Sequence, residues 1–217
     1  MNIRHHLDHA TVLAYAAGTL GEALTVVAAS HISWCPACRA AVRHAESMGG
    51  ELMLGLDAAT VSADCKTRTL NLLDRATLHR FPARAAVRGE LPAPLLRVLA
   101  GTPLRDLPWK RKAPGVALHH VPLSSADGGK LVLMRIAPGK AMPEHGHGGE
   151  ELTLVLSGAY RDEIGRFGPG DVADLDEDVE HRPVVEEGED CYCAVAIEAP
   201  TRFKSLPARL MQPFIGI

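Results

Sequence analysis

One short segment of the chain, HISWCPAC at residues 31–38, combines an imidazole with two thiols. A Cys-x2-Cys pair can be a redox dithiol, a metal clip or two unrelated buried cysteines. A thioredoxin-type dithiol follows a strand, whereas the stretch before Cys35, GEALTVVAASHISW, has the periodicity of an amphipathic helix. Zinc fits better, because His31 on the last turn of one helix can converge with Cys35 and Cys38 on one tetrahedral ion.

A structural zinc site is closed by four protein ligands, so these three residues require a fourth. The nearest candidates for the fourth ligand are His5, His6 and His9, and the sequence spacing does not distinguish among them. The chain has five cysteines, and this odd number argues against a disulfide framework. Metal binding or redox chemistry is therefore the better first interpretation of a close cysteine pair.

A second group of metal-binding side chains lies in GKAMPEHGHGGEELTLVLSG, which contains His145, His147 and Glu151. Residues two apart on a strand point to the same face, so both histidines can face one ion. Glu151 can add a carboxylate after the Gly-Gly corner, with Glu150 as the alternative. His181 can close the site from a neighbouring strand. Mixed imidazole and carboxylate ligands suit Zn, Fe, Mn, Ni or Cu.

Cys191 and Cys193 alternate on a predicted strand, CYCAVAIEA, so their side chains face the same way. If exposed, such a pair could sense oxidants. The simpler alternative is that both pack as buried strand cysteines inside a barrel.

The order of a histidine near the N-terminus followed by His-x3-Cys-x2-Cys between two helices resembles the zinc-binding anti-sigma domain. In that family the pattern anchors a small helical bundle that grips an alternative sigma factor of the extracytoplasmic-function type. The resemblance implies that His6, His31, Cys35 and Cys38 bind zinc.

The spacing Gly-x5-His-x-His-x3-Glu-x6-Gly resembles the first of the two cupin motifs. This resemblance implies a small antiparallel β-barrel that holds a divalent metal, expected to be zinc, through His145, His147, Glu151 and His181. The second motif departs from the pattern, because an acidic triplet at residues 176–178 replaces the usual Pro-x-Gly.

The secondary structure that must position these residues is predicted to be helical in the first part of the chain and β-type in the last part. Apolar residues recur at helical intervals from residue 10 to about 56, and glycines and a proline divide this stretch into three helices. A fourth helix is predicted over about residues 62–78, burying Leu70, Leu73 and Leu78.

The middle of the chain is rich in proline, and from residue 115 short β-type runs such as GKLVLMRIA alternate with Gly, Pro and Asp clusters. The predicted fold is α+β. A zinc-stabilised bundle of about four helices (1–80) is joined by a flexible linker (81–100) to an antiparallel β-barrel of the cupin type (101–217).

Composition and charge restrict the possible partners. The net charge is −3 and the C-terminal half is acidic, which gives no support to direct nucleic-acid binding. No uncharged apolar run approaches the roughly 20 residues that cross a bilayer, and the N-terminus lacks the apolar core of a signal peptide. We therefore expect a cytoplasmic protein with no membrane partner.

A zinc-binding helical domain followed by a cupin-like barrel is the arrangement of the ChrR-type anti-sigma factors, which this chain resembles along nearly its whole length. The resemblance implies a repressor rather than an enzyme. Its helices would occupy surfaces of the sigma factor that otherwise bind RNA polymerase, and its barrel would be needed to respond to singlet oxygen or related oxidants. The alternative is a metal-dependent cupin oxygenase or isomerase with an accessory zinc domain.

Overall fold

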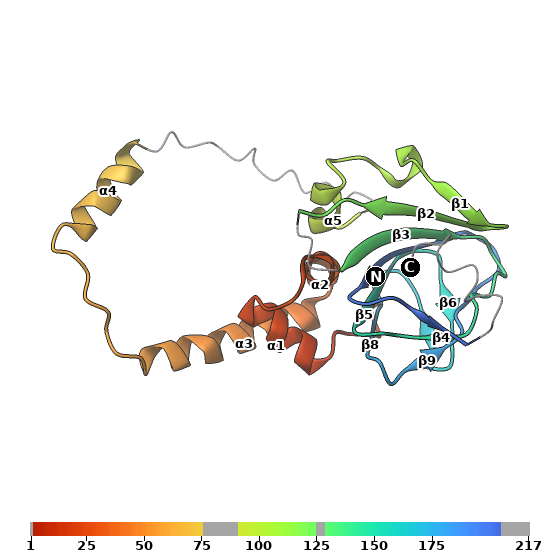
Figure 1. Cartoon of the computed structure of the whole chain (residues 1–217), viewed down its shortest axis with the longest axis horizontal. Coiled ribbons are helices and arrows are strands. Elements are labelled where there is room, and N and C mark those ends of the chain that lie inside the picture. The colour runs from red at the N-terminus through yellow and green to blue at the C-terminus, as the bar shows by residue number, and fades with distance from the viewer. Residues whose placement is uncertain (1, 76–90, 125–128, 205–217) are drawn as a thin grey trace.

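The computed structural model describes residues 2–75, 91–124 and 129–204 (Figure 1). The helices are α1 (His9–Ala17), α2 (Glu22–Trp34), α3 (Pro36–Leu54), α4 (Cys65–Arg75) and α5 (Ala93–Val98), with a 3-10 turn at Leu104–Asp106. The strands are β1 (Lys110–Ala113), β2 (Val116–Val121), β3 (Lys130–Ile136), β4 (His145–Gly146), β5 (Glu151–Ser157), β6 (Tyr160–Arg161), β7 (Arg166–Phe167), β8 (Val172–Leu175), β9 (Glu180–His181), β10 (Val184–Val185), β11 (Cys191–Ile197) and β12 (Arg202–Phe203). This order of elements confirms the predicted α+β fold, with helices first and antiparallel strands after them.

Within the described residues the strands form one large and two small antiparallel sheets. The large sheet has the order β1-β2-β3-β11-β5-β8, and the small sheets have the orders β10-β6-β7 and β12-β4-β9. Alternate residues of β3, among them Val132 and Met134, point into the barrel and pack with Phe167 and Val195. The barrel interior is therefore an apolar core of its own, as the predicted cupin-type architecture requires.

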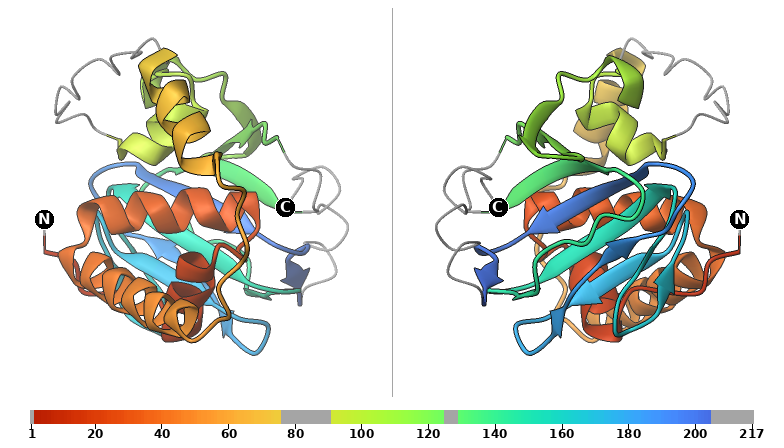
Figure 2. Two further views of the ribbon diagram at one scale, coloured as in Figure 1. Left: turned by 90° about the vertical axis from the view of Figure 1, so that its left-hand side faces the viewer. Right: turned by 90° about the vertical axis from the view of Figure 1, so that its right-hand side faces the viewer.

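The opposite face of the large sheet is also buried, because helix α2 lies across it (Figure 2). Leu24, Val27 and Ala28 on one face of α2 pack against residues of β3, β5 and β11, including Leu133 and Leu154. Strands with both faces covered read as nearly continuous apolar runs, which explains sequences such as KLVLM and ELTLVL. The helical part and the outer face of the large sheet thus share a second core, separate from the barrel interior.

Helix α5 extends that shared core into the predicted linker. Residues 81–90 of the linker lie outside the described residues, but Leu91, Leu95 and Leu99 are buried and pack in the same cluster as α2. The described part of the linker is therefore an ordered helix on the surface of α2. The boundaries of the predicted domains, 1–80 and 101–217, stay predictions.

Helices α1 and α2 meet at a sharp bend of 109°. Gly18 ends α1 in the left-handed region, with φ of 70°, and its N–H bonds to the carbonyls of Ala14 and Tyr15. Among the described residues no single helix is long and apolar enough to cross a membrane. The bent pair reaches the necessary length and composition only when its two helices are counted together.

Helix α4 stands apart from the other helices and the barrel (Figure 1). The prediction that it buries Leu70 and Leu73 is wrong, because these side chains are 50% and 65% exposed. The apolar face of α2 is buried against the sheet and α5, so it is not available to α4. Leu78, the third residue predicted to be buried there, lies outside the described residues.

We predict that Leu95→Ala lowers the free energy of unfolding by about 2–5 kcal/mol, because it leaves a cavity between α5 and α2. Chemical denaturation at fixed metal content measures the change. Leu72→Ala is the matched control, since Leu72 is 66% exposed, and it should change the free energy by no more than about 0.5 kcal/mol. Equal midpoints for the two variants would show that α5 is not part of the core.

Candidate metal centres

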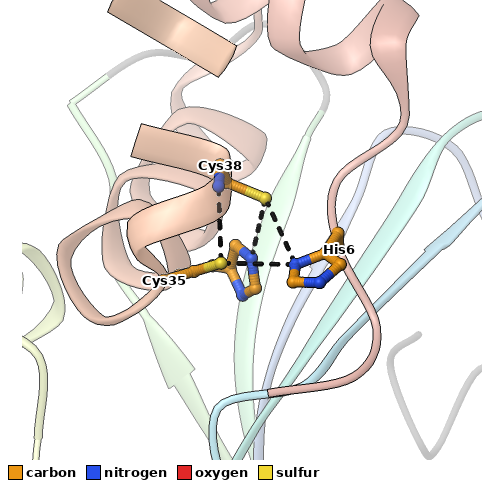
Figure 3. A group of neighbouring side chains, drawn as sticks. His6, Cys35 and Cys38 are labelled. Carbon is orange, nitrogen blue, oxygen red and sulfur yellow. Dashed lines mark hydrogen bonds between the residues drawn. The ribbon is translucent and has the colours of Figure 1, made fainter. Parts of the chain in front are cut away.

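The four predicted ligands near the N-terminus come together at the corner between α2 and α3. Figure 3 labels three of them, His6, Cys35 and Cys38. His6 lies on the segment before α1, and His31 is on the last turn of α2. Cys35 is the N-cap of α3, where its Sγ accepts the Cys38 backbone N–H at 3.4 Å, and Pro36 follows at the first helical position. The helix corner therefore aims both thiols at one point.

The distances within this cluster suit a tetrahedral ion. His31 Nε2 lies 3.2 Å from Cys38 Sγ, and His6 Nδ1 lies 3.3 Å from Cys35 Sγ and 3.7 Å from Cys38 Sγ. Sulfur and nitrogen ligands of one tetrahedral zinc ion lie about 3.5 Å apart. The donor set and its spacing thus fit zinc, although the role of these residues as ligands stays a prediction.

Protonation at this cluster is set by burial. Burial lowers the pKa of His31 to about 4, so its ring is neutral at pH 7. Burial also raises the pKa of the Cys38 thiol to about 11, against the opposing effect of the Leu7 backbone N–H. An ion that binds here must displace the Cys38 proton, and its charge then stabilises the buried thiolate.

A second cluster, inside the barrel, joins His145 on β4, His147 just after it, Glu151 at the start of β5 and His181 on β9. All four side chains are buried. The register of the small sheet pairs His145 directly with His181, and Glu151 enters from the large sheet. The two layers of the barrel therefore meet at this point.

Each histidine of the barrel cluster donates its Nδ1 proton outward. The acceptors are the Pro143 carbonyl for His145 at 2.8 Å and the Asp176 carbonyl for His147 at 3.2 Å. Thr153 donates to Glu151 Oε1 at 3.1 Å. These bonds leave the Nε2 lone pairs and one carboxylate oxygen facing the centre, which is the arrangement of a metal site.

Asp162 orients the third histidine. Its Oδ2 accepts the His181 Nδ1 proton at 2.9 Å, while its Oδ1 accepts the backbone N–H groups of Ile164 and Gly165 at 3.0 and 3.1 Å. Burial acts to raise the pKa of Asp162, but His181 and these N–H groups outweigh it and lower the pKa. Asp162 is thus held as an acceptor for His181.

The centre of the barrel cluster requires a positive charge or a proton. His145 Nε2 and His181 Nε2 face each other at 3.1 Å, and burial lowers the pKa of His145. His147 Nε2 has no hydrogen-bond partner among the described residues. Opposed lone pairs repel, so a divalent ion fits this arrangement, and when bound it would act as a Lewis acid toward small oxygen or nitrogen ligands.

A cavity of about 60 Å³ adjoins the cluster, with a mainly apolar wall that includes Met134, Met142 and Phe203. The Tyr160 hydroxyl in this wall has no hydrogen-bond partner among the described residues, and burial raises its pKa. A cavity needs about 10–15 Å³ for each water molecule. The space therefore holds a few waters or one small molecule beside the ligands.

The alternative ligands lie outside both clusters. His5 stacks on Phe167 with ring centroids 4.0 Å apart, and His9 is exposed at the start of α1. Glu150 is half-buried directly before β5, where its backbone N–H donates to Glu198 at 3.2 Å. Geometry therefore favours His6 and Glu151 over these neighbours.

Cys191 and Cys193 are both buried, with Sγ atoms 3.6 Å apart. A hydrogen bond with Cys191, together with burial, raises the pKa of Cys193. The interpretation as packed strand cysteines is therefore confirmed, and the exposure that an oxidant sensor would need is not met.

The residues that orient the candidate ligands could not be found from the sequence. Asp162 and the turn at residues 168–171 are far in sequence from the histidines they contact. No spacing rule connects them, because side-chain to backbone contacts between distant segments follow only from the fold.

Comparison with known proteins identifies the class of the barrel. Residues 100–199 match the model of the ChrR cupin-like domain. Over its full length the chain is 43% identical to the anti-sigma-E factor ChrR of Cereibacter sphaeroides, and the alignment covers 100% of both chains. The chain therefore belongs to the ChrR family of anti-sigma factors.

A solved structure of that kind also matches the whole architecture. It is the crystal structure of Rhodobacter sphaeroides SigE in complex with the anti-sigma ChrR. The match has 39% identity and a TM-score of 0.77, and it covers 90% of this chain and 99% of the other. The predicted membership of the ChrR-type anti-sigma factors is confirmed.

We predict that Asp162→Asn weakens metal binding in the barrel about 10- to 100-fold. The amide can keep its oxygen on the two backbone N–H groups, but it then presents an N–H to His181 Nδ1. His181 would have to carry its proton on Nε2, the atom that faces the centre. Competition with a chromophoric chelator measures the affinity. Asp178→Asn, at an exposed position, is the control, and equal affinities for the two variants would refute the role of Asp162.

Proposed function

We propose that this chain binds and inhibits a sigma factor of the extracytoplasmic-function type, and that it does so in the cytoplasm. Its membership of the ChrR family and the complex formed by the structural relative support this proposal. The observation in this chain that carries it is a large set of exposed apolar side chains on the helical part.

This surface, which we call the α3–α4 surface, consists of exposed apolar side chains on the second half of α3, on α4 and between them. Its members are Met48, Leu52, Met53, Leu54, Leu56, Val61, Leu70, Leu72 and Leu73. A stable monomer rarely leaves so many large apolar side chains exposed, and exposed apolar side chains in such numbers mark protein interfaces. A partner that covers them would gain apolar burial from both helices.

The isolation of α4 supports the same conclusion. A helix of 11 residues has marginal stability in water without tertiary contacts, because helices shorter than about 12–15 residues nucleate poorly. The described side chains of α4 are exposed except for that of Cys65, which is half-buried. Binding of its leucine face in a groove of the sigma factor would supply the missing contacts.

We propose zinc as the ion of both centres. Two thiolates and two imidazoles form a closed tetrahedral set that zinc prefers, which suits a structural role at the α2–α3 corner. Three imidazoles and one carboxylate also suit zinc, and their burial beside a small cavity suits a module that responds to a small molecule. We assign the response to singlet oxygen or related oxidants to this barrel.

The alternative of a cupin oxygenase or isomerase is not adopted. The relative that matches the full length of both chains is a regulator. The cavity beside the barrel cluster, of about 60 Å³, has room for no more than a few waters or one small molecule.

We predict that the double variant Leu70→Asp/Leu73→Asp loses at least about tenfold in affinity for the sigma factor, since two buried carboxylates would replace apolar contacts. The partner is identified by co-expressing the chain with the sigma factors of its source organism, and calorimetry then measures the affinity. Ile164→Asp, at an exposed apolar position on the barrel, should bind normally. Undiminished affinity of the double variant would reject the α3–α4 surface.

We predict that His145→Ala separates the two functions of the chain. The variant should carry about one zinc ion instead of about two, still bind the sigma factor, and fail to release it under singlet oxygen. Metal analysis of the purified complex and a reporter of the sigma factor measure these outcomes. Loss of sigma-factor binding would contradict the assignment of repression to the helices and of response to the barrel.

A further inference from the structure

The turn between β7 and β8 contacts the N-terminal segment through Asp171, which is only 3% exposed. One carboxylate oxygen accepts the backbone N–H groups of Arg4 at 2.6 Å and His5 at 3.0 Å. The other oxygen accepts the N–H of Gly168 at 2.9 Å, within the turn itself. One side chain of the barrel therefore holds two successive residues directly before His6.

His5 and Asp8 add further contacts around His6. The His5 carbonyl accepts the Val172 N–H at 3.4 Å, and the His5 ring stacks on Phe167. On the other side of His6, the Asp8 N–H donates to Asp174 at 2.8 Å. The segment carrying His6 is thus held along β8 at both ends.

The same turn orients the second imidazole of the cluster. His31 Nδ1 donates to the Gly170 carbonyl at 2.9 Å. This bond places the proton on Nδ1 and leaves the Nε2 lone pair for the ion, 3.2 Å from Cys38 Sγ. A barrel residue 139 positions away therefore sets the tautomer of a ligand on α2.

We propose that the β7–β8 turn of the barrel is part of the N-terminal metal site, with Asp171 as its positioning residue. The ligand set divides into two halves. Cys35 and Cys38 are positioned by their own helix corner, whereas His6 and His31 are positioned by the barrel. This assignment does not depend on the sigma factor, because it concerns only how the chain holds its ion.

The contribution of Asp171 follows from its burial and its hydrogen bonds. Its carboxylate accepts three backbone N–H groups, and hydrogen bonds to a charged acceptor are stronger than neutral ones. Without it, the Arg4 and His5 N–H groups lose their acceptor, and the segment before α1 gains conformational freedom that ion binding must remove. Groups that orient metal ligands typically contribute about 10- to 100-fold in metal affinity.

The test uses the full chain loaded with Co²⁺. Charge-transfer absorption from thiolate to cobalt reports the N-terminal site alone, because the barrel cluster contains no sulfur ligand. After addition of excess EDTA, Asp171→Ala should lose this absorption at least about tenfold faster than the unmodified chain. Its visible cobalt bands should also weaken, since a displaced imidazole opens the tetrahedral site to water.

Two controls separate positioning from general stability. Asp190→Ala removes a carboxylate that pairs with Arg135 at 2.7 Å, away from the turn, and should release cobalt at the normal rate. Val132→Ala makes a cavity in the barrel core and should lower the unfolding midpoint without changing the rate. Equal rates for Asp171→Ala and the unmodified chain, or an equally fast Val132→Ala, would overturn the proposal.

If Asp171→Ala does not fold, Asp171→Asn decides the question. The amide retains the shape of the side chain, but its single oxygen can accept either from Arg4 and His5 or from Gly168, not from both. This variant should therefore also release cobalt faster. A normal rate for a folded Asp171→Asn whose near-ultraviolet circular dichroism is unchanged would overturn the proposal.

Discussion

A sheet that is apolar on both faces has to be covered on both sides, and this constraint organises the whole chain. The barrel interior covers one face of the β3-β11-β5 sheet, and α2 with α5 covers the other. Burial of roughly 25 cal/mol for each square ångström of apolar surface favours this docking over separated domains. The helical part is consequently placed against the β7–β8 turn, where the candidate ligand His31 finds its hydrogen-bond acceptor.

The two metal clusters follow the same physical rule in different settings. In each, a histidine donates one ring proton to an oxygen fixed by the fold, Gly170 for His31 and Asp162 for His181, and turns the other nitrogen inward. Burial keeps the rings neutral by lowering the pKa of His31 and of His145. Both sites are therefore prepared for a cation by groups that do not touch it.

The helical part divides its apolar residues between the core and the solvent. Leu24 and Val27 on α2 are buried against the sheet, and within the described part of the chain the leucines of α4 stay exposed. The four candidate metal ligands gather at the corner where α3 begins, and the exposed apolar residues lie toward the far end of that helix. The chain thus combines a rigid base with an uncovered surface, which is how a protein can be stable alone and still bind a partner through apolar contacts.

The sequence alone was sufficient to predict the helix breaks and most of the candidate metal ligands, because these depend on local chemistry. Features that depend only on neighbouring residues are the helix breaks at Gly18 and Pro36, the Cys-x2-Cys corner and the spacing of His145 and His147. The structure brings the two cysteines together in one cluster and the two histidines together in the other. The resemblance to the zinc-binding anti-sigma domain added His6, which spacing could not select, and the resemblance to the cupin motifs supported His181.

Tertiary structure decided what depends on contacts between distant segments. The packing of α2 on the sheet left Leu70 and Leu73 of α4 exposed, although their spacing is that of a buried helix face. Asp162 and Asp171 carry no signal in sequence, because a carboxylate becomes an acceptor for a ligand or a backbone only when the fold brings the two together. The sequence pattern specifies which faces of helices and strands are apolar. Only tertiary packing determines which of these apolar faces become buried.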